Sequence, residues 1–274
     1  MNPTELRALL DAHGVRPSRA LGQNFLVDPN TARRVVRLAE VEPGDRVLEI
    51  GPGAGSLTIA LADAGARVRA VEVDRHLVPV LEAVVGARDV EIVTADAMTV
   101  DWNALLGDAP RWAMVSNLPY NVATPVAVRC LEDAPMVDRM LCMVQREVGE
   151  RLAAPVGTRQ YGAVTVKVAY YAEASIAGIV PPTVFTPRPK VDSALVKFVR
   201  HPPPVTVADP GRMFALVRAG FATRRKTLRN ALSAELGDRT VPVLDAAGID
   251  PARRAETLTL TDWAALTEAS EENP

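Results

Sequence analysis

The segment Asn117-Leu118-Pro119-Tyr120 follows directly on the apolar run "WAMV" and combines an amide, a rigid backbone and an aromatic ring. The exocyclic amine of adenine is a poor nucleophile because its lone pair is delocalised into the ring. Two acceptors, the Asn117 side-chain oxygen and the Leu118 carbonyl, could hold the two amine hydrogens and direct the nitrogen at a methyl donor. Pro119 would fix that carbonyl, and Tyr120 could stack on the purine. The alternative is an ordinary proline turn with a packed tyrosine.

A glycine-rich stretch, "LEIGPGAGSLT", lies upstream of this segment. Gly51, Gly53 and Gly55 allow a tight turn and close approach of a ligand to the backbone, just before a helix whose first N–H groups are unpaired. Ser56 stands where the dinucleotide fingerprint has glycine or alanine, and Glu49 would repel a pyrophosphate. An acid here suits a cation or an ammonium group, and S-adenosylmethionine carries a sulfonium and an ammonium. The stretch therefore favours S-adenosylmethionine as cofactor.

Two more acids follow later apolar runs at comparable places. Glu72, in "AVEVD", can accept hydrogen bonds from both ribose hydroxyls, and Asp96, in "TADAM", can accept one from the adenine amine. Either acid alone would be typical of an ordinary turn. Both together, in this order after the glycine loop, favour a nucleoside site.

These residues depend on an alternation of short apolar runs and amphipathic segments. Strands are predicted at residues 46–51, 67–74, 90–96 and 112–117, with helices between and after them, and a fifth strand leads into a helix within 140–154. This alternation is typical of a parallel sheet covered on both faces, whose strand carboxyl ends form the site. Residues 163–175 and 193–200 are predicted as an antiparallel pair of strands that closes the sheet edge.

The remainder of the chain predicts a second domain. The proline-rich residues 202–211 suit a stiff linker, because proline joins neither a ladder nor a helix interior. Beyond them, 212–237 and 260–269 have helical patterns. We therefore expect a catalytic domain at 1–201 that includes an N-terminal lid, a linker at 202–211, and an all-α RNA-binding domain at 212–274.

Composition restricts the class of protein. The 274 residues are 48% hydrophobic with a net charge of −2, so a nucleic-acid partner has to be bound by local basic patches. Two cysteines without metal-ligand spacing argue against metal and disulfide chemistry in this sequence, and no apolar run reaches the length of a membrane span. We expect a cytoplasmic protein with neither metal nor membrane association.

Basic residues gather in a few segments that predict RNA contacts. In "FATRRKTLRNAL" a helix would place Arg225 and Arg229 on one face, four residues apart. The predicted RNA-binding set is Arg188, Lys190, Arg224, Arg225, Lys226 and Arg229. A further run, Arg33, Arg34 and Arg37, is equally well explained as a solvated helix face.

The motifs taken in order resemble a known family. "LGQNFL", "EIGPGAGSLT", "VEVD", "ADAM", "NLPYNVATP", "FTPRPKVDSA" and "FATRRKTLRNAL" look like those of the small-subunit (16S) ribosomal RNA adenine dimethyltransferases over almost the whole chain. The resemblance implies a Rossmann-like class I S-adenosylmethionine-dependent α/β domain, with a mostly parallel seven-stranded sheet and an antiparallel edge strand, plus a small C-terminal all-α domain. It implies transfer of four methyl groups to two adjacent adenosines in the 3′-terminal hairpin of 16S ribosomal RNA.

The resemblance also assigns residues. Cofactor contacts are implied for Asn24, Leu26, Gly51, Glu72, Asp96 and Asn117. The catalytic set becomes Asn117, Leu118, Pro119, Tyr120 and Phe185, the last flanking an extruded adenine opposite Tyr120, with Phe185 as simple core the alternative. "LGQNFLVD" would form a lid over the cofactor. The enzyme is expected to act as a monomer.

Two alternatives remain open from the sequence. One is the related large-subunit (23S) adenine methyltransferase of the macrolide-resistance type, against which "NLPY" and "RRKTLRNAL" argue. The other is a non-catalytic RNA-binding or assembly factor that keeps the cofactor fold, against which the intact glycine loop argues.

Overall fold

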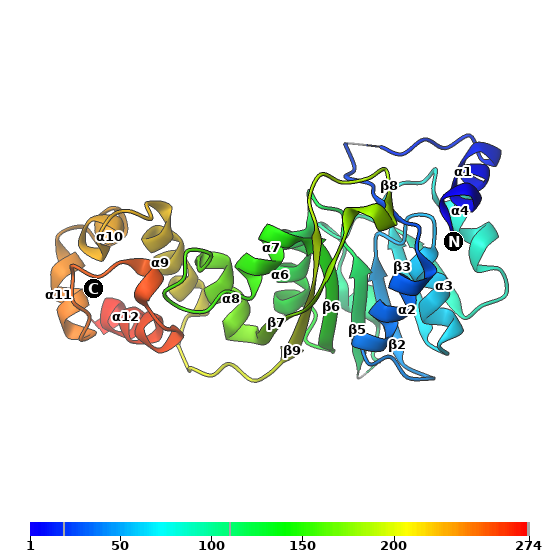
Figure 1. The fold of residues 1–274 in the computed structure, drawn as a ribbon. Helices are drawn as coiled ribbons and strands as arrows, with labels where there is room; N and C mark the ends of the chain where they lie inside the picture. Colours follow the sequence, from blue (N-terminus) through cyan, green and yellow to red (C-terminus); the bar gives the residue numbers. More distant parts are fainter. Residues whose placement is uncertain (19, 110, 273–274) are drawn as a thin grey trace. The chain divides into compact units, whose positions relative to one another are not determined.

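The computed structural model describes residues 1–18, 20–109 and 111–272 (Figure 1). The chain divides into two compact units, which are described separately. The first comprises residues 1–149 and 174–200, and the second residues 150–173 and 201–274.

A seven-stranded sheet forms the centre of the first unit. Its order is β4-β3-β2-β5-β6-β9-β7. The strands are β2 (Arg46–Ile50), β3 (Arg67–Glu72), β4 (Val90–Thr94), β5 (Trp112–Asn117), β6 (Val137–Gln145), β7 (Ala172–Val180) and β9 (Ser193–Arg200). Strands β4, β3, β2, β5 and β6 pair in parallel, and β9 pairs antiparallel with β6. The predicted mostly parallel sheet with an antiparallel strand at one end is confirmed.

Two helices, α1 and α2, precede the sheet, and the others follow the parallel strands in the predicted alternation. They are α1 (Pro3–Ala12), α2 (Pro29–Leu38), α3 (Ser56–Asp63), α4 (Val78–Val85), α5 (Trp102–Leu106), α6 (Ala123–Asp133) and α7 (Arg146–Leu152). Helices α2 and α3 bury Val35 and Leu61 against one sheet face, together with Leu141 of β6. Cys130 of α6 lies near Cys142, whose side chain points to the opposite face from Leu141, so α6 covers the other side.

The N-terminal segment is tied to the sheet domain at two places. Leu6 and Leu10 of α1 share a buried cluster with Phe25, Ala54 of the glycine loop and Leu77 before α4. Strand β1 (Phe25–Leu26) pairs antiparallel with β8 (Phe185–Thr186), which follows the short 3-10 helix η1 (Pro182–Val184). Asp28 then caps α2 by accepting from the backbone of Asn30 and Thr31. Together these contacts fix the chain entering the domain next to the carboxyl ends of the strands.

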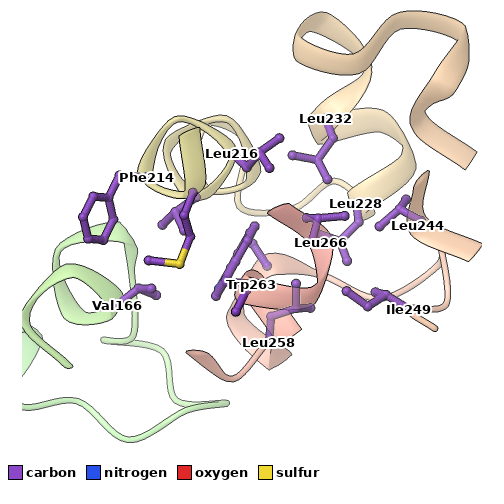
Figure 2. Packing of buried hydrophobic residues seen from close by; sticks show 14 of the residues in the cluster. Val166, Phe214, Leu216, Leu228, Leu232, Leu244, Ile249, Leu258, Trp263 and Leu266 are labelled. Carbon is purple, nitrogen blue, oxygen red and sulfur yellow. The ribbon is translucent and has the colours of Figure 1, made fainter. Parts of the chain in front are cut away.

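The second unit is helical and has its own core (Figure 2). It contains α8 (Ala163–Tyr171), α9 (Pro210–Ala222), α10 (Leu228–Leu236), η2 (Gly237–Arg239), α11 (Thr240–Ala246), η3 (Ala255–Thr257) and α12 (Leu260–Glu272). Trp263 is fully buried among side chains such as Phe214, Leu216 and Leu258. The predicted C-terminal all-α unit is therefore present.

Three details of the sequence analysis need correction. Residues 163–171, expected as a strand, form α8, because Val166 and Tyr170, one helical turn apart, both pack into the core of the second unit. Residues 150–173 accordingly belong to this second unit and not to the predicted catalytic domain of 1–201. The basic segment is not continuous helix, since a turn at 223–227 separates α9 from α10.

Among the described residues, no helix has both the length and the apolar character needed to cross a bilayer.

Candidate active site

The glycine loop joins β2 to α3 and is closely packed on both sides. Gly51 and Gly53 have φ angles of 71° and 57°, in the left-handed region that favours glycine. A Cβ on Gly51 would lie 3.0 Å from Cδ of Pro119, and one on Gly53 would lie 2.9 Å from the ring of Phe25. The loop therefore needs glycine for its backbone conformation and for its close contacts with Pro119 and with Phe25 of the N-terminal segment.

Glu72 ends β3 and connects that strand to the glycine loop. Its two carboxyl oxygens accept hydrogen bonds from the backbone N–H of Gly53 at 3.1 Å and of Asp74 at 2.9 Å. Burial raises the pKa of this carboxyl above its ordinary value, against the effect of those two hydrogen bonds. Each oxygen keeps a further lone pair for a ribose hydroxyl, as the predicted role requires.

Glu49 is buried at the end of β2, 1% exposed, and lines the same cavity. Burial raises the pKa of Glu49 to about 8, and the nearby Glu72 adds to the rise. Among the described residues, its Oε2 has no hydrogen-bond partner. An unsatisfied buried acid suits a cationic group of a bound molecule.

Asp96 follows β4 and is exposed on the cavity side. One oxygen, Oδ1, accepts from the backbone N–H of Met98 at 2.8 Å. This bond fixes the carboxylate and leaves Oδ2 for an adenine amine.

Residues 117–121, which we call the catalytic segment, begin with the last residue of β5. The Asn117 side-chain nitrogen donates to the Asn24 carbonyl at 3.1 Å, so the amide oxygen is the end left for a substrate. The Leu118 N–H donates to Met143 of β6 at 3.1 Å, and its side chain is 1% exposed. Two acceptors are thus held by rigid neighbours at the end of a buried strand.

Tyr120 has a partner that the sequence analysis missed. Its hydroxyl forms a 2.7 Å hydrogen bond with Oγ of Ser193, a fully buried residue at the start of β9. Burial raises the pKa of Tyr120, so the phenol stays neutral. The small side chain of Ser193, within "KVDSA", has no periodicity or spacing that marks it, and only the sheet pairing brings it here.

Residues 20–28, which include β1, lie against this arrangement, and we call them the lid segment. The Asn121 side chain donates to the Ala20 carbonyl at 3.2 Å, and Gly22 lies so near Asn121 that a Cβ would be 2.8 Å from its Oδ1. Gln23 donates to Asp74 at 2.8 Å. The lid segment therefore contacts both the catalytic segment and the end of β3.

Nearly all of the predicted site residues line one cavity. Its lining includes Asn24, Leu26, Gly51, Glu72, Asp96, Asn117, Leu118, Pro119 and Tyr120. The glycine loop, the two buried acids and the free oxygens of Asp96 and Asn117 fit the adenosine and amino-acid parts of S-adenosylmethionine.

Phe185 is placed differently from the prediction. It is 3% exposed, pairs with Leu26 across β1 and β8, and packs in the buried cluster with Val35 and Leu195. It is absent from the cavity lining. The structure thus places Phe185 in the core, because its side chain is buried in the same cluster as Val35 and Leu195, and we do not retain it as a flank for a base.

The predicted RNA-binding residues lie in two separate places. Arg188 and Lys190 are exposed in the loop between β8 and β9 of the first unit. In the second unit, Arg224, Arg225, Lys226 and Arg229 are exposed on and after the 223–227 turn, which we call the basic turn. Arg225 lies in the turn while Arg229 lies in α10, so the predicted shared helix face is wrong.

The sheet order, the glycine loop and the acids at successive strand ends define a class I S-adenosylmethionine-dependent methyltransferase. The family model for ribosomal RNA adenine dimethylase matches residues 15–272. The chain belongs to this family.

Relatives agree with that membership. The chain is 49% identical over 273 residues to "Ribosomal RNA small subunit methyltransferase A" of Kineococcus radiotolerans, covering 97% of this chain and 90% of the relative. The protein of the same name from Streptomyces griseus is 48% identical, covering 98% and 94%.

Solved structures show the same fold. The crystal structure of the 23S rRNA methyltransferase ErmE has a TM-score of 0.68 at 28% identity, covering 90% of this chain and all of that one. A dimethyladenosine transferase from Plasmodium falciparum has a TM-score of 0.73 at 23% identity, covering 88% and 95%, and supports the fold alone.

Proposed function

We propose that this protein transfers methyl groups from S-adenosylmethionine to N6 of two adjacent adenosines in the 3′-terminal hairpin of small-subunit (16S) ribosomal RNA, during biogenesis of that subunit. Relatives that are 44–49% identical over nearly the full chain carry the small-subunit name, whereas the large-subunit enzyme ErmE is 28% identical. This difference favours the small-subunit substrate over the large-subunit alternative.

The observation that carries the proposal is the hydrogen bond from Asn117 to the Asn24 carbonyl. This bond leaves the amide oxygen as the end available to a substrate, and Asn117 and Leu118 both line the cavity together with the glycine loop. Two adjacent acceptors match the two hydrogens of an adenine N6 amine.

The cofactor, when bound, supplies a methyl group on a cationic sulfur. Asn117 and Leu118 hold the N6 hydrogens so that the nitrogen lone pair points at the methyl carbon. With the cofactor bound, formation of the N–C bond would break the C–S bond, and the nitrogen held by Asn117 and Leu118, then cationic, would lose its proton to water. Tyr120, held by Ser193, stacks on the adenine ring. Catalysis rests on positioning and electrostatics and requires no residue with a tuned pKa.

Cofactor contacts are proposed for Asn24, Leu26, Gly51, Glu72, Asp96 and Asn117, which all line one cavity. Pro119 supports the catalytic segment through its contact with Gly51. RNA contacts are proposed for Arg188, Lys190, Arg224, Arg225, Lys226 and Arg229, which are exposed cations. We propose a monomer, working in the cytoplasm where ribosomal subunits are assembled.

The test uses purified protein, labelled S-adenosylmethionine and small-subunit particles that lack this modification. After digestion of the RNA, N6,N6-dimethyladenosine confined to the 3′-terminal hairpin is the expected product. Large-subunit particles serve as the matched control. Label in the large-subunit RNA would instead identify the large-subunit enzyme, and particle binding without label would contradict an enzymatic function.

A further inference from the structure

The site has two halves: a cofactor half around Glu72 and the glycine loop, and a catalytic half around Asn117. Gln23 lies in the lid segment, which contacts both halves, and has no role in the function proposed above. Its side-chain Oε1 accepts from the Ser18 N–H at 2.7 Å, and its Nε2 donates to Oδ2 of Asp74 at 2.8 Å. Because an acceptor and a donor on neighbouring chain segments fix both ends, the amide has one orientation. Gln23 is partly buried, so these bonds are shielded from water.

Asp74 in turn is bonded to Glu72. The Asp74 N–H donates to Glu72 Oε1 at 2.9 Å, and Glu72 Oε2 accepts from Gly53 of the glycine loop at 3.1 Å. The other oxygen of Asp74, Oδ1, accepts from the His76 N–H at 3.0 Å, which fixes the carboxylate. Asp74 therefore links Gln23, which bonds to its side chain, to Glu72, the acid proposed to bind ribose, which bonds to its backbone N–H.

The next residue along the chain, Asn24, contacts the opposite half of the site. Its carbonyl accepts from the Asn117 side chain at 3.1 Å and so sets which end of that amide faces the substrate. Residues 23 and 24 are adjacent, so a displacement of one moves the other. The dipeptide spans the cofactor half and the catalytic half.

We propose that Gln23 is a positioning residue that couples the two halves: its hydrogen bond to Asp74 seats the lid segment so that the Asn24 carbonyl orients Asn117 for methyl transfer. This inference rests on the proposed function for the roles of Glu72 and Asn117. It assigns Gln23 effects on both cofactor affinity and transfer rate, although the residue need touch neither reacting atom.

An exchange of the two partners tests the proposal. In Gln23→Glu two carboxylates would face each other, and in Asp74→Asn two NH₂ groups would, unless one amide turned over and lost Ser18 or His76. In the double variant, the carboxylate introduced at position 23 would accept from both the Ser18 N–H and the new amide at position 74, while that amide's oxygen keeps His76. The double variant therefore restores the bond in the reverse direction with the original net charge.

Two readouts are required: the dissociation constant of S-adenosylhomocysteine by calorimetry, and the single-turnover methylation rate at saturating cofactor. We expect Gln23→Glu to raise the dissociation constant and to lower the methylation rate, each about tenfold or more, and Asp74→Asn to change both in the same directions but less. In the double variant both quantities should return to within about threefold of the unsubstituted protein. Gln23→Ala, which adds no charge, should give an intermediate loss. Gln160→Glu, an exposed site in the second unit, is the charge-matched control.

An unchanged Gln23→Glu variant, or a double variant as impaired as Gln23→Glu, would overturn the proposal. A loss of cofactor affinity with an unaltered single-turnover rate would also overturn it, because a local role at the cofactor does not reach Asn117. Thermal unfolding of each variant checks folding. Since the calorimetric cycle needs no RNA, it still reports on Gln23 if the unsubstituted protein binds cofactor but methylates nothing, which would be a failure of the proposed function.

Discussion

The cavity of the first unit and the basic turn of the second hold their polar groups in contrasting ways. In the cavity, Glu72, Asn117 and Tyr120 each have a fixed protein partner within about 3.1 Å. In and just after the basic turn, Arg224 donates to the Arg159 carbonyl and pairs with Glu256 at 3.5 Å. Among the described residues, the side chains of Arg225, Lys226 and Arg229 have no such partner.

The contrast follows from what each region has to do. Directing a nitrogen at a methyl carbon depends on sub-ångström placement, which needs buried strand ends and saturated hydrogen bonds. Holding a phosphate backbone depends on charge, which exposed arginines and lysines provide without a fixed geometry. Substitutions in the cavity should therefore change rates steeply, and substitutions in the basic turn should change binding gradually.

The largest effect is expected from Asn117→Ala. It removes an acceptor that acts mainly in the transition state, so turnover should fall about 100-fold or more, a larger loss than that of cofactor affinity. Methylation rates and calorimetry with S-adenosylhomocysteine measure the two quantities. Asn103→Ala, at an exposed position of α5, is the matched control. Methylation at the original rate would remove Asn117 from the mechanism.

Glu49 is the exception within the cavity, because it is buried without a full set of partners. Its pKa of about 8 in the folded protein exceeds the ordinary value of 4.5, so the folded state holds this proton more tightly than the unfolded state. The free energy of unfolding should fall as pH rises from 4.5 to 8, by up to about 1.4 kcal/mol per pH unit. In Glu49→Gln that contribution is absent.

Denaturant unfolding of both proteins between pH 5.5 and 8.5 checks this prediction. The stability of Glu49→Gln relative to the unsubstituted protein should increase up to pH 8 and then level off. Glu82→Gln, at an exposed position of α4, provides the charge-matched control. A stability difference that is constant with pH would contradict the burial argument.

Gly51→Ala tests how tightly the cofactor half and the catalytic half are packed. The substitution adds backbone strain of about 1–2 kcal/mol at φ 71° and places a methyl 3.0 Å from Pro119. Gly248→Ala is the control, since φ is 69° and nothing lies within 4 Å of the added Cβ. Both variants should lose stability, but only Gly51→Ala should also lose about tenfold in methylation rate. Equal rates in the two variants would show that the Pro119 contact is unimportant.

The same contrast explains how far the sequence could be interpreted. The placement of Glu72, Asp96 and Asn117 around one cavity was predictable, because the carboxyl ends of parallel strands lie at the same edge of a sheet, so that motifs at successive strand ends imply a shared site. The hydrogen bonds of Ser193 with Tyr120 and of Gln23 with Asp74 were not predictable, because they depend on contacts between distant segments. Phe185 and α8 were misplaced for a related reason: an aromatic in a proline loop and a valine-rich run have no local signal for which core will bury them.

The smallest effect is expected from Arg225→Ala combined with Arg229→Ala. Two exposed cations on either side of the start of α10 would each contact phosphate, so their loss should weaken binding to small-subunit particles about tenfold. The slope of log affinity against log salt should also fall, by up to about two units, while cofactor affinity stays unchanged. Arg218→Ala, exposed on α9 of the same unit, is the matched control.

Because the structure places Arg225 in the turn and Arg229 in the helix, each single variant should account for roughly half of the change in salt slope. A double variant that bound particles as well as the unsubstituted protein at every salt concentration would mean that the basic turn is only a solvated surface.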